Sequence, residues 1–169
     1  MRKIILLAAA LAAAATAAAG CAAVRQAAAK ASCFSTSGHW FKNGGTARIV
    51  AVEHALTNVG HADTAAGHAR FTPATVTAIK TADSKLAAAI ASLRRDLPPS
   101  CVTGARADMS AGLSDFASSV RDQESAVAAV QAKNPAAART AFTRAGRAFQ
   151  AGSQKFDAAA RAIRAYVKS

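Results

Sequence analysis

Large apolar side chains recur along the chain in steps of three and four, a spacing that gathers them on one face of a helix. From Thr46 onward this pattern defines four segments, which are separated by Gly, Pro and Asn residues. The apolar positions of the first two segments are Ile49, Val52, Leu56 and Val59, then Val76, Ile79, Leu86, Ile90, Leu93 and Leu97. Those of the last two are Met109, Leu113, Phe116, Val120, Val127 and Val130, then Phe142, Phe149, Phe156 and Ile163.

Capping residues set the ends of the first two predicted helices. The first begins at Thr46 and ends between Gly60 and His68, because the glycines weaken its last turns. The second begins at Pro73, with Thr72 as its N-cap. Proline suits the first helical position because its missing N–H would have no partner there.

The remaining ends follow from prolines and small polar residues. Pro98-Pro99 end the second helix, and either Ser100 or Thr103 can cap the third. Asn134-Pro135 end the third helix and cap the fourth. Since short connections make consecutive helices antiparallel, the sequence predicts an all-α, up-down-up-down four-helix bundle.

Composition agrees with this fold class. Alanine, the best helix former, accounts for 50 residues, and aromatic residues for only 5% of the chain, so a β-sandwich or barrel is not expected. In the fourth helix, a large residue recurs every seven positions: Phe142, Phe149, Phe156 and Ile163. The alternate heptad positions are mostly small: Ala138, Ala145, Gly152, Ala159 and Tyr166. Large residues packed against small ones let two helices approach closely.

The first twenty residues have the layout of a secretory signal peptide. Arg2 and Lys3 precede an uncharged apolar run that ends at Gly20. The sequence Ala18-Ala19-Gly20-Cys21 resembles the lipobox of bacterial lipoprotein precursors, although the family has Leu more often at the first position. This resemblance implies that Cys21 receives the lipid and becomes the N-terminus of a protein held on the outer face of the cell membrane. Alternatives are ordinary signal-peptide cleavage that leaves Cys21 free, and a transmembrane anchor, for which the run is short.

The cysteine count distinguishes these alternatives. The chain has three cysteines, and an odd number in an exported protein leaves one thiol unexplained. If Cys21 carries lipid, Cys33 and Cys101 remain as one disulfide pair. The predicted organisation is then a cleaved leader (residues 1–20), an Ala-rich tether (21–32) and a bundle domain (33–169). Its irregular N-terminal cap, which contains Phe34, Trp40 and Phe41, is tied down by the disulfide.

The net charge of +12 suggests an anionic partner. Removal of residues 1–20 takes away two cations and leaves +10. The basic face of the fourth helix consists of Arg144, Arg147, Arg161 and Arg164, flanked by Arg139 and Lys155. Nucleic acid is not expected, because the leader directs the domain out of the cytoplasm and no base-stacking motif accompanies the arginines. Anionic lipid, an anionic wall polymer or a protein partner is expected instead.

The residues that carry chemistry do not form a catalytic or metal-binding motif. His54, His61 and His68 lie seven residues apart, about 10.5 Å along a helix, too far to share one metal ion. Neither Glu53 nor Glu124 has the histidine three residues later that di-iron bundles need. We therefore expect no enzyme, no metal and no cofactor.

Two polar residues occupy core positions. Asp83 and Gln123 each stand at a position where the repeat calls for an apolar residue. Asp63 does so too if the first helix continues past Gly60. A polar layer inside a bundle can fix the register of the helices or bind a small polar ligand. Alternatively, a local stutter in the repeat turns these side chains outward, or they pair with a nearby arginine. The principal hypothesis is a non-enzymatic, membrane-anchored lipoprotein with a basic binding surface. The alternative is a ligand-sensing or carrier bundle that uses this polar layer.

Overall fold

The computed structural model describes residues 33, 35, 38–68, 71–102 and 104–168. The predicted leader, the tether and Cys21 lie outside them. Most of the described residues are helical and none lies in a strand, so the prediction of an all-α fold is confirmed for this part of the chain. The long helices are α2 (Gly45–His68), α3 (Pro73–Arg94), α4 (Ala105–Gln131) and α5 (Pro135–Lys168).

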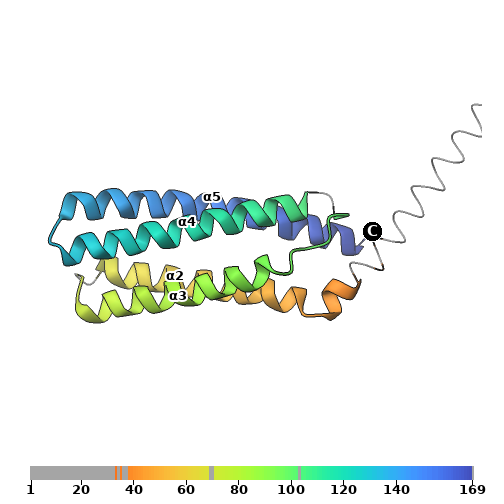
Figure 1. Cartoon of the computed structure of the whole chain (residues 1–169), viewed down its shortest axis with the longest axis horizontal. Helices are drawn as coiled ribbons and strands as arrows, with labels where there is room; N and C mark the ends of the chain where they lie inside the picture. Colours follow the sequence, from red (N-terminus) through yellow and green to blue (C-terminus); the bar gives the residue numbers. More distant parts are fainter. Residues whose placement is uncertain (1–32, 34, 36–37, 69–70, 103, 169) are drawn as a thin grey trace, which may run out of the picture. The chain divides into compact units, whose positions relative to one another are not determined.

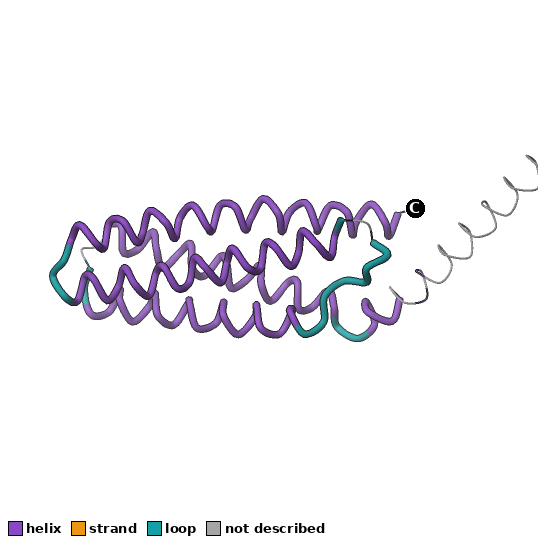
Figure 2. Tube along the Cα trace, turned by 45° about the horizontal axis from the view of Figure 1, so that its top comes forward, coloured by secondary structure: helices purple, strands orange, loops and turns teal. Residues whose placement is uncertain are grey.

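Within residues 40–168 the four long helices lie side by side, and consecutive helices run in opposite directions (Figure 1). The α2–α3 and α4–α5 connections lie at one end, and the longer α3–α4 connection lies at the other end (Figure 2). α4 and α5 approach each other most closely. Among the described residues, no Cα atom of α2 comes within 8 Å of one of α5. The four helices are therefore unevenly spaced.

Glycines explain the close approach of α4 and α5. A Cβ atom on Gly112 would lie 3.0 Å from the carbonyl oxygen of Gly152, and one on Gly152 would lie 3.1 Å from that of Gly112. The alternate small positions predicted on α5 are buried: Ala138, Ala145, Gly152 and Ala159. Ser119 adds a buried hydrogen bond, because its Oγ donates to the carbonyl oxygen of Ala145 at 2.9 Å.

The core contains most of the predicted apolar positions, whereas others, among them Phe142 and Phe149 on α5, are only half-buried. Its largest fully buried side chains include Phe116, Ile79, Leu86, Leu93, Met109 and Leu113. Trp40 closes one end of the core, where it is 6% exposed and donates from Nε1 to the carbonyl oxygen of Asp96 at 2.9 Å. The side chain of Asp96 in turn pairs with Arg48 of α2. These contacts tie the start of α2 to the α3–α4 connection.

Two capping predictions are confirmed. Thr72 caps α3 in a reciprocal arrangement with Thr75, and Pro73 occupies the first helical position. Asn134 caps α5, since its Oδ1 accepts the backbone N–H of Ala137 at 3.1 Å. In both places a short polar side chain satisfies a backbone N–H that has no partner inside the helix.

Two local predictions are corrected. The N-cap of α4 is Gly104, with φ of 79° and no side-chain cap, in place of Ser100 or Thr103. The N-terminal cap is not wholly irregular, since residues 38–42 are helical before a turn at residues 43–44. The end of α2 falls within its predicted range, at His68, because one exposed glycine at position 60 costs only about 1 kcal/mol in a helix.

Candidate functional site

The predicted polar layer forms, but it divides into two parts. Asp83 on α3 and Gln123 on α4 are each 3% exposed, so both occupy core positions as predicted. Asp63 lies on α2 beyond Gly60 but is exposed, so the prediction that it also takes a core position is wrong. Gln123 Nε2 donates to both carboxylate oxygens of Asp63, at 2.6 and 2.7 Å. No arginine pairs with these side chains among the described residues.

The Asp63–Gln123 pair faces a small cavity of about 150 Å³ between α2, α4 and α5. The cavity is also lined by Gly60, Ser119, Phe142, Ala145, Gly146 and Phe149. Burial raises the pKa of Asp63, and the hydrogen bond from Gln123 partly offsets this effect. The Oε1 atom of Gln123 is buried with no hydrogen-bond partner among the described residues.

Asp83 has no such partner. Both of its carboxylate oxygens are buried without a hydrogen bond from any described residue. Burial, together with the smaller effects of the nearby Asp63 and Glu124 carboxylates, raises the pKa of Asp83 to about 7. Asp83 and Glu124 line a second cavity of about 520 Å³ between α3 and α4. Sequence reasoning missed Glu124 here, because it lies beside Gln123 on α4 and outside the apolar repeat.

The basic face of α5 is only partly free of acidic partners. Arg144 pairs with Asp122 at 3.0 Å, and Lys155 pairs with Asp115 at 2.7 Å, so these two cations join α5 to α4. The remaining basic residues of this face are exposed, and none forms an ion pair with another described residue: Arg139, Arg147, Arg161 and Arg164.

A second group of cations, which the sequence analysis did not bring together, lines a groove between α3 and α4. Arg94, Arg95 and Arg121 surround a hollow of about 630 Å³. Its walls are otherwise formed by Ala87, Ile90, Ala91, Ala117, Val120 and Glu124. We call this feature the arginine groove. None of its three arginines forms an ion pair with another described residue.

Hydrogen bonds hold two of these guanidinium groups in place. Arg94 Nη2 donates to the carbonyl oxygen of Leu113 and to Ser114 Oγ, both at 3.2 Å. Arg121 Nη2 donates to Ser118 Oγ at 3.0 Å. Each guanidinium has five N–H donors, so donors remain for an external anion. The groove exists because Ala87, Ala91 and Ala117 leave the space between α3 and α4 unfilled.

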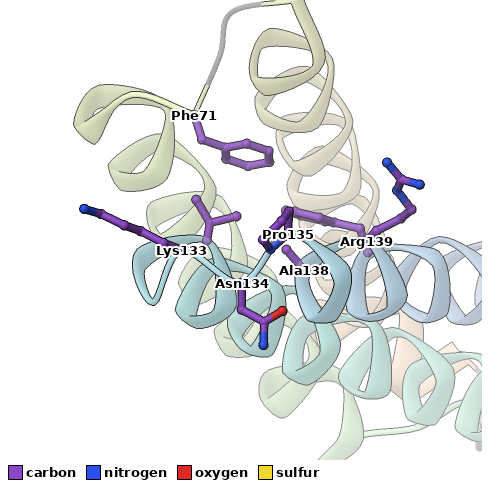
Figure 3. Close-up of a pocket in the computed structure, with 8 residues that line it drawn as sticks. Phe71, Lys133, Asn134, Pro135, Ala138 and Arg139 are labelled. Carbon is purple, nitrogen blue, oxygen red and sulfur yellow. The ribbon is translucent and has the colours of Figure 1, made fainter.

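A fourth concave site lies next to the α4–α5 connection (Figure 3). Phe71 stacks on Phe142, with ring centroids 5.2 Å apart and planes inclined by 24°. The hollow beside these rings has a volume of about 370 Å³. In Figure 3, Lys133 and Arg139 lie on opposite sides of it. Phe71 remains 40% exposed.

The histidine stripe forms no site. His54 and His61 are exposed on α2, and the side chain of His68 lies outside the described residues. No three His, Cys, Asp or Glu side chains of the described residues lie close enough to hold a metal ion. Cys33 and Cys101 are both disulfide-bonded. Within the described part of the chain, no helix combines the length and apolar character needed to cross a bilayer.

The comparisons with known proteins add no functional assignment. No family model matches the chain, and neither a curated protein nor a solved structure resembles it significantly.

Proposed function

We propose that the chain is a membrane-anchored, extracytoplasmic lipoprotein without enzymatic activity, whose helical domain binds anionic components of the cell envelope. A lipid on Cys21 anchors it, and a Cys33–Cys101 disulfide ties the N-terminal cap to an up-down-up-down four-helix bundle. The lipobox-like residues 18–21 support the anchor. The disulfide-bonded state of Cys33 and Cys101 agrees with the cysteine arithmetic.

The observation that carries the binding proposal is the arginine groove. Arg94, Arg95 and Arg121 bring three positive charges to one hollow, and Glu124 supplies a single negative charge. Three cations without acidic partners repel one another, and a phosphate or carboxylate group placed between them removes this repulsion. The apolar floor accommodates the uncharged part of such a molecule.

A lipid anchor favours partners at the membrane. An anchored domain meets lipid head groups and nearby wall polymers at a high effective concentration, so moderate affinity is sufficient. The exposed arginines of α5 then strengthen long-range attraction without forming a defined site. A protein partner with an acidic surface is the other candidate of matching charge.

The test compares two charge-matched double variants of residues 22–169, produced without the leader and Cys21 so that neither the apolar leader nor a lipid contributes. Arg95→Gln with Arg121→Gln alters the groove, and Arg147→Gln with Arg161→Gln alters the outer face of α5. Both variants lose two charges. We expect the groove variant to bind anionic vesicles about tenfold more weakly than the control variant, because the groove arginines bond directly to the bound anion, whereas Arg147 and Arg161 act only at long range. Equal binding by the two variants would contradict a role for the groove.

A further inference from the structure

Asp83 is a buried carboxylate without a hydrogen-bond donor. It is 3% exposed, and neither of its oxygens accepts a hydrogen bond from a described residue. Most buried polar groups in proteins are hydrogen-bonded, because burial without a partner costs about 1–3 kcal/mol and more for a charged group. Asp83 therefore needs either a proton or a donor from outside the chain.

The cavity beside Asp83 offers room for an external donor. It has a volume of about 520 Å³, within the range of small-molecule sites. Its polar wall consists of Lys80, Asp83, Ser84, Glu124 and Gln131. Its apolar wall consists of Ala87, Val127 and Ala128. The wall thus combines hydrogen-bond acceptors with an aliphatic surface.

The charge around this cavity is opposite in sign to that of the protein. Lys80 contributes one positive charge, while Asp83 and Glu124 contribute two negative charges. Asp63 on α2 adds a further negative field at Asp83. A monovalent cation would compensate the excess negative charge. A metal ion is disfavoured, because no three candidate ligands of the described residues converge.

We propose that this cavity binds a small primary ammonium compound, with its –NH₃⁺ group between Asp83 and Glu124. An ammonium group has three donors and no acceptor, which matches a wall of carboxylate, hydroxyl and amide oxygens. Its hydrogen bonds to carboxylates are charge-assisted and stronger than those of a neutral alcohol. The aliphatic part of the ligand then lies along Ala87, Val127 and Ala128. This inference does not depend on the lipid anchor or on anion binding, although the cavity shares Ala87 and Glu124 with the arginine groove.

The test is an NMR titration of the full chain with propylammonium at pH 8, with 1-propanol and propionate as neutral and anionic probes of similar shape. We expect only propylammonium to shift the signals of α3 and α4 residues around the cavity. We also expect its binding to weaken at least about fivefold at pH 5, where Asp83 is protonated. Lys80, Asp63 and Glu124 are the other ionisable groups that face Asp83. No saturable shift, or equal shifts with 1-propanol or propionate, would overturn the proposal.

Two variants connect the binding to this cavity. Asp83→Asn keeps the shape of the side chain and is expected to weaken propylammonium binding about tenfold or more. Asp157→Asn removes the same charge from an exposed position of α5 and should leave the affinity unchanged. If Asp83→Asn does not fold, Glu124→Gln at the exposed side of the cavity is the substitute, with an expected loss of about threefold or more. Unchanged affinity in a folded cavity variant would overturn the proposal.

Discussion

The Cβ position of Gly152 on α5 lies 2.7 Å from Cδ1 of Phe116 on α4. Phe116 is fully buried, and its ring also packs against Phe149 and Phe156, with centroid distances of 5.7 and 5.9 Å. The ring therefore occupies the space that a side chain at position 152 would need. Close approach of α4 and α5 depends on this contact between a large residue and a glycine.

We expect Gly152→Ala to destabilise the protein by about 1–3 kcal/mol, the usual cost of adding a methyl group to a packed interior. Gly146→Ala is the matched control on the same helix, because its Cβ would meet nothing within 4 Å. The control should stabilise the protein by about 0.5–1 kcal/mol through helix propensity. Urea unfolding measures both values. A Gly152→Ala variant as stable as the control would show that the α4–α5 contact is looser than described.

The stability of the protein should depend on the ionisation of Asp83. Its pKa in the folded protein is raised to about 7 from 3.8, so between these values the folded state holds a proton that the unfolded state has released. Stability contributed by this proton is present below pH 3.8 and is lost as the pH rises toward 7. The loss amounts to at most roughly 4 kcal/mol.

Comparison with Asp83→Asn isolates this effect. The variant has no titrating group at position 83, so its free energy of unfolding relative to the natural protein should increase from pH 4 to pH 8. Asp157→Asn, which removes an exposed charge on α5, should show no such increase. A difference between Asp83→Asn and the natural protein that stays constant over this pH range would mean that Asp83 titrates normally.

The proposed Cys33–Cys101 disulfide should stabilise the domain. The bond would close a loop of 67 intervening residues, for which loop-closure entropy gives about 4 kcal/mol. Cys33→Ser should therefore lower the urea midpoint substantially, whereas Cys21→Ser should leave it unchanged. Mass spectrometry of the unreduced, protease-digested protein identifies the pairing. A peptide that links either cysteine to Cys21 would contradict this assignment.

Processing of the precursor should depend on Cys21. In a bacterial host that has the lipoprotein pathway, we expect the natural precursor to be cleaved before Cys21 and to partition into membranes. Cys21→Ser should accumulate uncleaved, because the lipidated cysteine is the residue that the resemblance implies at the cleavage site. The intact mass of the membrane-extracted protein measures both events. Normal cleavage and membrane partitioning of Cys21→Ser would contradict the lipoprotein proposal.

Much of the helical pattern could be predicted from the sequence, because it depends on local spacing. Thr72, Pro73 and Asn134 act through backbone groups within one turn, so their roles could be inferred directly. Gly104 could not be identified as the N-cap of α4, since its role depends on a positive φ angle that the sequence does not reveal. The nearby Ser100 and Thr103 are more usual capping residues.

The sites were less predictable than the fold, because they depend on distances between helices. The repeat placed Asp83 and Gln123 in the core correctly. It could not show that Gln123 bonds to Asp63 while Asp83 remains without a donor. Similarly, the arginine groove forms because small residues on α3 and α4 face each other, a relationship that the spacing within one helix does not reveal.

The most direct test of the central claim is the binding of residues 22–169, produced without the leader and Cys21, to lipid vesicles at low and high salt. We predict binding to vesicles rich in anionic lipid, little binding to zwitterionic vesicles, and a loss of about tenfold or more in affinity as salt shortens the electrostatic range. Equal affinity for both kinds of vesicle, or binding that does not respond to salt, would contradict the proposal that the basic surface recognises anionic envelope components.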